Sequence, residues 1–456
     1  PVPLVGTFTL QAEGEKFAEL ATHLSGSASL KAAPGADQST PGQRRELEMN
    51  VKRIADGVEV DLGKLIWGET DLQARVRYHT TTPPNFEIDV RGGSLSLIPW
   101  EKSEPDKDNQ GTREDPGVLS KVAETSSSVF RRVLSAPSRL LSGDETTAPS
   151  DRYFSDEPMN LSALHEYDFT VKGELASVRS IMGEAKNLKF HAKVDGGNLD
   201  LDASIGSVNG GSIEIKMDYD TSLTTPAGKL TSTFRNIYST PAQVSYPRSG
   251  FIDLTSSGSS QAELAANLDG LAYAEFGKGV MDYRGLAFLT SDIASGVFGA
   301  LIPGAEKKKP EIRCGVVLGQ FQQGIGVTPY GYAIRTRRAN LIGRVDVDLI
   351  KERIELRFDS RSRKGTGLSV GNVFSNTVRL QGPLTNPSIV PNTTSLLWRG
   401  WAAVMTAGLS VVGESVLKRA LVADTPCENI RREIQKGMCG GDEPVTSPMV
   451  CPPAQG

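Results

Sequence analysis

The chain has 456 residues, too many for one ordinary compact core, so its length favours two or three domains or one extended β-structure. Its formal net charge is −4, which argues against nucleic acid as a partner because phosphate binding needs an excess of Lys and Arg. Hydrophobic residues are 38% and aromatic residues 6% of the chain, which is low for a thick globular core, while 47 glycines fit many turns.

Residues 1–100 carry strand patterns. Apolar and polar residues alternate in Glu46–Val60, Leu72–Tyr78, Asn85–Val90 and Ser94–Ile98. Alternation with a period of two places one row of side chains on a buried face and the other row in water. We therefore expect residues 1–100 to form a β-sheet segment.

Residues 101–160 interrupt this pattern with a polar insertion that begins EKSEPDKDNQGTREDPG and has no period. Within it, Val118–Leu141 has apolar residues at helical spacing, and its arginines lie on other faces. This amphipathic helix is expected either to cap the open end of a sheet or to lie on a membrane or in a groove.

Residues 161–250 return to alternating strands, in a segment of β-hairpin repeats. The predicted strands are Tyr167–Gly173, Leu188–Val194, Asn198–Ile205 and Ser212–Tyr219. Gly196-Gly197 and Gly210-Gly211 separate alternating runs, as hairpin connections require. Residues 221–260 are rich in Ser, Thr, Gly and Pro and are predicted to be a join between two β-segments.

Residues 251–392 hold the densest series of predicted strands. These are Ala262–Leu268, Ala272–Phe276, Val280–Tyr283, Arg313–Phe321, Gly324–Pro329, Tyr332–Arg338, Leu341–Asp348, Arg353–Asp359 and Asn376–Gln381. Leu286–Ile302 is apolar around most of its circumference and predicts a buried or inserted helix. The segment VDVDLIKERIELRFD predicts a hairpin with its polar turn at Lys351-Glu352.

Residues 393–456 are predicted to form an amphipathic helix and a cysteine-bearing tail. The helix, Leu396–Ala423, has about fourteen residues without a charge, which is too short to span a bilayer. Trp398 and Trp401 lie three residues apart on one face of this helix. Because amphipathic rings favour a membrane boundary, both are membrane-interface candidates.

Three of the four cysteines, Cys427, Cys439 and Cys451, lie in the tail, and the fourth is Cys314. The segment CENIRREIQKGMC places Cys427 and Cys439 at the ends of a short helix, and we expect them to form a disulfide. Such a bond implies an oxidising compartment. A metal site and free thiols are the alternatives; the spacing is not of the CxxC type and no histidine lies nearby.

The sequence offers no constellation of catalytic residues. The four histidines are scattered, with no HExxH or HxH arrangement, and no GxSxG motif stands between a strand and a helix. The glycine-rich stretch Gly324–Gly326 lacks the helix and the lysine of a phosphate-binding loop. We therefore expect no enzymatic activity, no cofactor and no bound metal.

An ordered series of motifs resembles the AsmA family. Ser257–Gly279, SGSSQAELAANLDGLAYAEFGKG, is similar to the LxANLDGxxxxxFGxG block of that family. Cys314–Phe358 resembles its C-terminal strand block, and Gln381–Asn392, QGPLTNPSIVPN, its GxLxxPxxxP ending. Leu188–Asp220 resembles its repeated hairpin unit. The resemblance covers Leu188 to Asn392; the polar insertion and the cysteine-bearing tail depart from it.

The resemblance implies a fold and a function. The fold is mainly β, an elongated, curved antiparallel sheet that forms an open trough with a few amphipathic helices. The function is binding or transfer of phospholipid between the inner and outer membranes, hence outer membrane biogenesis, in the periplasm of a Gram-negative bacterium. The family's N-terminal transmembrane helix is not present here, so anchoring to the inner membrane would need a segment outside this chain.

The alternation by itself also predicts a continuous apolar face. Its lipid-groove candidates are Val60, Leu62, Val76, Leu199, Leu201, Ile213, Ile215, Val345, Val347, Ile354 and Leu356. An apolar sheet face needs a cover of lipid, helix or partner protein. The alternatives are therefore an ordinary packed core, and a structural or assembly factor that docks on an envelope protein complex.

Overall fold

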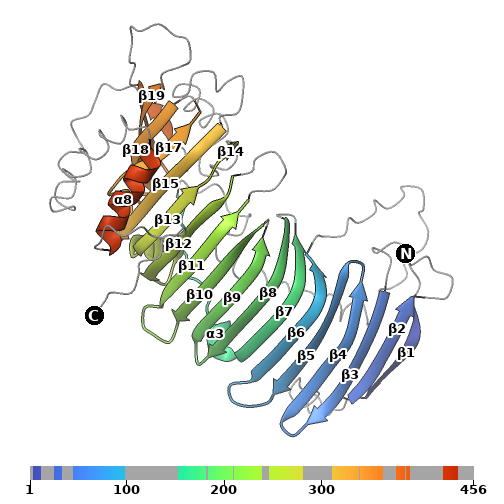
Figure 1. Cartoon of the computed structure of the whole chain (residues 1–456). Helices are drawn as coiled ribbons and strands as arrows, with labels where there is room; N and C mark the ends of the chain where they lie inside the picture. Colours follow the sequence, from blue (N-terminus) through green and yellow to red (C-terminus); the bar gives the residue numbers. More distant parts are fainter. Residues whose placement is uncertain are drawn as a thin grey trace, which may run out of the picture.

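The computed structural model describes residues 4–11, 25–32, 45–97, 152–180, 183–208, 210–238, 246–280, 311–337, 339–362, 376–385, 387–390 and 425–439. The strands of these residues belong to one sheet of 21 strands that runs the length of the molecule (Figure 1). The expectation of a mainly β, elongated and curved sheet is therefore confirmed.

The strands of the first half are β1 (Leu4–Gln11), β2 (Ser25–Ala32), β3 (Arg45–Ile54), β4 (Gly57–Trp67), β5 (Thr70–His79), β6 (Asn85–Ser96), β7 (Asp168–Ser180), β8 (Gly183–Asp195), β9 (Asn198–Val208) and β10 (Gly211–Asp220). Those of the second half are β11 (Ala227–Ile237), β12 (Arg248–Ser257), β13 (Asp269–Phe276), β14 (Gly279–Val280), β15 (Glu311–Gln322), β16 (Ile325–Val327), β17 (Tyr332–Thr336), β18 (Ala339–Asp348), β19 (Arg353–Ser362), β20 (Asn376–Pro383) and β21 (Ser388–Val390). The helices of the described residues are α3 (Ala163–Glu166), α4 (Gln261–Ala266) and α8 (Pro426–Cys439).

Neighbours in the sheet are mostly neighbours in the chain. From β1 to β13 each strand pairs with the next, and β13 then pairs with β15. Beyond β15 the order continues through β16 and β17 to β18, β19, β20 and β21. The pairs are antiparallel except β6 with β7, which run parallel, so the expectation of a wholly antiparallel sheet is wrong at this one pair. The predicted segments 1–100, 161–250 and 251–392 thus contribute strands to a single sheet.

Three local predictions are wrong. Glu46–Val60 is not one strand but a hairpin, because the chain turns at Ala55-Asp56 and pairs Ile54 with Gly57. The supposed join at 221–260 contains β11 and β12, two full strands. Its Ser and Thr side chains are small or β-branched, and they fit a half-buried pleated surface.

The third is Ala262–Leu268, predicted as a strand, most of which is helix α4. Ser260 is its N-cap, and its hydroxyl accepts a hydrogen bond from the backbone N–H of Glu263. The Glu263 carboxylate accepts one in return from the N–H of Ser259, one residue before the cap. This reciprocal arrangement fixes a helix start in a stretch whose alternation is only apparent.

The hairpin predictions hold. Gly196 and Gly197, both with positive φ, join β8 to β9, as type I′ turns require. The hairpin of β18 and β19 pairs Asp348 with Arg353 around residues 349–352. The predicted helices at 118–141, 286–302 and 396–423, with Trp398 and Trp401, lie outside the described residues.

Candidate functional site

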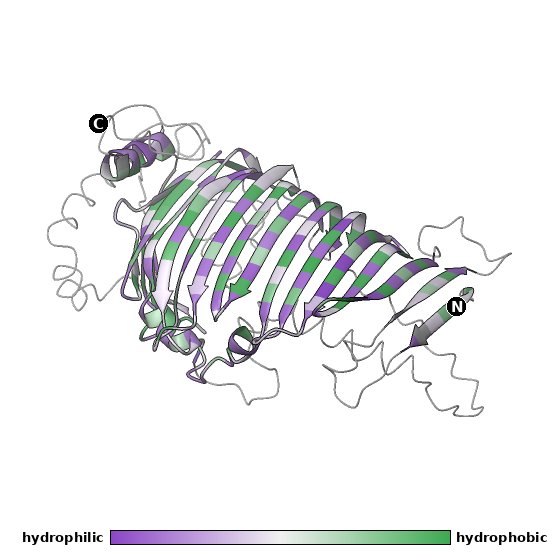
Figure 2. Cartoon of the chain, turned by 90° about the horizontal axis from the view of Figure 1, so that it is seen from below, coloured by the Kyte–Doolittle hydropathy of each residue, from purple (hydrophilic) through white to green (hydrophobic). Residues whose placement is uncertain are grey.

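The candidate site is the side of the sheet that carries the apolar residue of each alternating pair, which we call the apolar face. Opposed residues in neighbouring strands point to the same side of a sheet, so the register identifies the face. One row across nine strands consists of Val60, Val76, Ile88, Val171, Ala192, Leu201, Met217, Leu230 and Leu254. Alternating bands along the strands mark the same pattern (Figure 2).

All of the predicted lipid-groove candidates lie on the apolar face. Val60, Leu62 and Val76 are in β4 and β5, Leu199 and Leu201 in β9, and Ile213 and Ile215 in β10. Val345 opposes Leu356 and Val347 opposes Ile354 in the hairpin of β18 and β19. Alternation within each strand, together with the register between strands, thus places side chains from distant parts of the sequence on one surface.

The middle of the apolar face is half-buried. In β9 and β10, side chains of the apolar face are partly covered while most of those on the other side, such as Asp200 and Glu214, are exposed. Within the described residues, no second sheet packs over this face, and α4 contacts it at the end of β12.

Aromatic rings on the apolar face lie over glycines of the neighbouring strand. A Cβ atom at Gly173 would lie 2.2 Å from Cε1 of Phe190, and one at Gly250 would lie 2.7 Å from Cζ of Phe234. The missing side chains let these rings lie down along the sheet, an arrangement known to stabilise strand glycines. The Phe190 and Phe234 rings therefore add apolar area to the face while they lie close to the sheet. Sequence reasoning missed these pairs because they depend on register.

The two ends of the apolar face differ. Phe8, on β1, is 54% exposed, whereas Leu341 and Leu380, on β18 and β20, are 1% and 0% exposed. Of the predicted candidates, Leu356 belongs to this buried end. Partly exposed residues of the face run from the first strands to about β13, with buried residues such as Val51 and Val194 among them.

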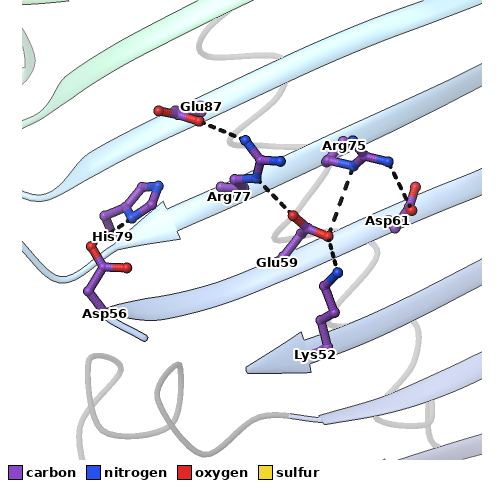
Figure 3. Close-up of polar contacts among 8 residues, drawn as sticks. All are labelled: Lys52, Asp56, Glu59, Asp61, Arg75, Arg77, His79 and Glu87. Carbon is purple, nitrogen blue, oxygen red and sulfur yellow. Dashed lines mark hydrogen bonds and ion pairs between the residues drawn. The ribbon is translucent and has the colours of Figure 1, made fainter. Parts of the chain in front are cut away.

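The opposite side, which we call the polar face, carries cross-strand ion pairs. The carboxylate of Glu59 on β4 forms ion pairs with Nζ of Lys52 at 2.8 Å and with Nε of Arg77 at 2.8 Å. Arg77 also forms an ion pair with Glu87 at 3.2 Å (Figure 3). These four residues oppose one another on four neighbouring strands. Hydrogen bonds from Lys52 and Arg77 lower the pKa of Glu59 from its ordinary value near 4.5 to about 2.

We expect Glu59→Gln to destabilise the chain by about 1 kcal/mol near pH 6, because both cationic partners are substantially exposed and the carboxylate is not. A folded-state pKa below the unfolded one gives stability above pH 4.5 that is lost as the pH falls towards 2. Urea unfolding at pH 6 and pH 2.5 should show a smaller acid loss for the variant than for the unmodified chain. Glu174→Gln, at a carboxylate that is 68% exposed, is the control and should behave like the unmodified chain.

Helix α8 covers the end of the polar face where β13, β15, β17 and β18 carry apolar side chains on that side. It packs against β15 and β17 (Figure 1). Ile430 and Ile434 are fully buried there, against a cluster that includes Tyr273, Val316, Leu318, Ala333 and Ile342. Arg431 forms an ion pair with Glu275 at 2.7 Å, and the Tyr273 hydroxyl donates to the same carboxylate oxygen at 3.0 Å.

The disulfide joins Cys427 to Cys314, with their Cα atoms 6.3 Å apart, so the predicted pair Cys427–Cys439 is wrong. Both residues of that predicted pair lie in α8, and an α-helix rises 1.5 Å per residue. Twelve residues therefore separate their Cα atoms by roughly 18 Å, far beyond the roughly 7 Å that a disulfide can bridge. Cys314 of β15 lies instead beneath the first turn of α8.

Other chemistry is sparse. The described residues contain no group of three His, Cys, Asp or Glu side chains that could hold a metal ion. Among the described helices, none is long and apolar enough to cross a membrane.

Comparisons with protein-family models, with curated proteins and with solved structures found no match to the chain. The resemblance to the AsmA family therefore rests on the sequence motifs alone.

Proposed function

We propose that the chain binds phospholipid through its apolar face and holds the acyl chains along it. The observation that carries the proposal is the row of apolar side chains that continues across β4 to β12 and stays only partly buried. Contiguous apolar surface of this extent is a liability in water and typically marks a binding surface. Each methylene buried on it would contribute roughly 0.8 kcal/mol, which holds acyl chains without polar contacts.

The polar face supports the same proposal. Its exposed ion pairs, such as Lys216 with Asp202 and Lys229 with Asp253, suit contact with water and not with lipid. A sheet with one wet and one apolar side can hold acyl chains on one side while it remains soluble on the other. The disulfide supports an oxidising compartment. Together with the AsmA resemblance, these features favour lipid transfer between two membranes in a Gram-negative periplasm.

The test uses adjacent positions on opposite sides of β11. Leu230 opposes Met217 and Leu254 on the apolar face, whereas Thr231 opposes Lys216 and Asp253 on the polar face. We expect Leu230→Glu to reduce copurified phospholipid about tenfold or more, because a carboxylate against acyl chains is costly to desolvate. Thr231→Glu adds the same charge beside a lysine and should leave lipid content unchanged.

Native mass spectrometry and lipid extraction of the purified proteins measure this effect. Phospholipid absent from the unmodified chain, or lost equally from both variants, would contradict the proposal. The assembly-factor hypothesis stays a prediction, and lipid-free protein that captures an envelope complex would favour it.

A further inference from the structure

Three arginines stand in one row on the polar face of the last strands. Arg344 of β18 opposes Arg357 of β19, and Arg357 opposes Arg379 of β20. They share this face with Ile342, which packs under α8, two residues from Arg344 on the same strand. Neighbouring strands lie about 4.8 Å apart, so the three side chains start close together.

This row breaks the charge pattern of the face. Like charges directly opposed across strands are destabilising. Most rows alternate in sign, as in Lys52, Glu59, Arg77 and Glu87, and like-charged pairs such as Asp200 with Asp218 stop at two residues. Among the described residues, this is the one cross-strand row with three successive charges of the same sign. A row of like charges that neighbouring acids compensate only in part is a candidate functional position.

The nearby carboxylates only partly compensate the row. One oxygen of Glu355, Oε1, accepts from Nε of Arg357 at 2.8 Å and contacts Nε of Arg379 at 3.4 Å. Arg344 makes no hydrogen bond or ion pair with the described residues, and its Nε is buried without a partner. A buried N–H group without a partner is destabilising.

Two further acids lie nearby. Asp346 is on the same strand and face as Arg344, and Asp359 is on the next row of β19. Burial raises the pKa of Asp346, while the charges of Arg344 and Arg357 lower it, so Asp346 is a counter-charge that both arginines share. Arg357 meanwhile keeps its terminal N–H groups available, with a side chain that is 40% exposed.

We propose that Arg344 and Arg357 form a binding site for a phosphate group. A guanidinium presents N–H donors in a planar fork that matches phosphate oxygens, and two such forks side by side can share one tetrahedral anion. Bound phosphate would satisfy the donors of Arg344 and relieve its repulsion with Arg357. The phosphate could belong to an anionic lipid headgroup or to a soluble phosphoester. The site lies on the face opposite the acyl-chain surface, so it does not depend on lipid binding there.

Calorimetric titration of inorganic phosphate into the full chain tests the site. Arg344→Gln is expected to weaken phosphate binding about tenfold, the worth of a lost charged hydrogen bond. Arg344→Lys keeps the positive charge but lacks the planar guanidinium, so its phosphate affinity should lie between that of the unmodified chain and that of Arg344→Gln. Arg75→Gln removes a polar-face arginine that contacts Asp61 at 3.3 Å, and should bind phosphate like the unmodified chain. Circular dichroism confirms that each variant is folded.

Flotation with vesicles of phosphatidylglycerol or of phosphatidylcholine separates the two sources of phosphate. If the unmodified chain floats with phosphatidylglycerol vesicles and Arg344→Gln does not, the site is supported with a lipid headgroup as its ligand. Phosphate binding that depends on Arg344, with flotation unchanged, would support it with a soluble ligand. Equal phosphate affinity in Arg344→Gln and Arg75→Gln, or no phosphate binding and no flotation, would overturn the proposal. The lipid content of the apolar face is read separately with Leu230→Glu.

Discussion

Loss of the disulfide between Cys314 and Cys427 is expected to lower the free energy of unfolding by about 4 kcal/mol. The bond joins residues 113 positions apart, and in the chain-entropy account the stabilisation by a cross-link increases with the length of the loop it closes. The loss should concentrate at α8, because Cys427 ties the first turn of that helix to β15. Urea unfolding of Cys314→Ala/Cys427→Ala, compared with the oxidised chain, measures it.

The design separates the bond from the side chains. The double variant should not respond to added reductant, whereas the unmodified chain should lose about the same stability on reduction as the variant has lost already. Limited proteolysis should cut at α8 first, both in the double variant and in the unmodified chain after reduction. An unchanged urea midpoint in the double variant would mean that Ile430 and Ile434 hold the helix without the disulfide.

The sheet was predictable because its signal is local. Each strand has one wet and one apolar side, so a period of two in the sequence reports both the element and the face. Leu199 and Leu201 could be assigned to the same surface as Val345 and Val347 without knowledge of which strands are neighbours. The hairpin at Gly196-Gly197 was equally local, because its turn chemistry lies within the segment it connects.

The features that could not be predicted depend on contacts between residues far apart in the sequence. Cys427 pairs with a residue of another strand, and nothing in the spacing of the tail cysteines encodes that partner. Glu59 looks like any exposed residue of an alternating strand, yet its two neighbours make it a buried ion-pair centre. The row from Arg344 to Arg379 is likewise visible only once the register of three strands is known.

The difference between the ends of the apolar face leads to a prediction about where lipid lies. Phe190 and Phe234 are half-buried on the open middle of the face, while Phe358, on the same face at the closed end, is 6% exposed. A photo-crosslinking benzoylphenylalanine at position 190 or 234 should therefore capture phospholipid in high yield. The same group at position 358 should capture little, because protein already fills its surroundings.

Replacing one aromatic residue by another keeps the three variants comparable, and thermal unfolding shows whether each is intact. Mass spectrometry of the crosslinked protein gives the yield at each position. Equal capture at all three positions would mean that the closed end opens to lipid and that the face is a through-passage. Capture at positions 190 and 234 alone would make it a blind-ended surface, which lipid enters and leaves from the side of β1 or along its length. The burial of Leu341 and Leu380 favours the second outcome, because close packing at that end leaves no room for an acyl chain.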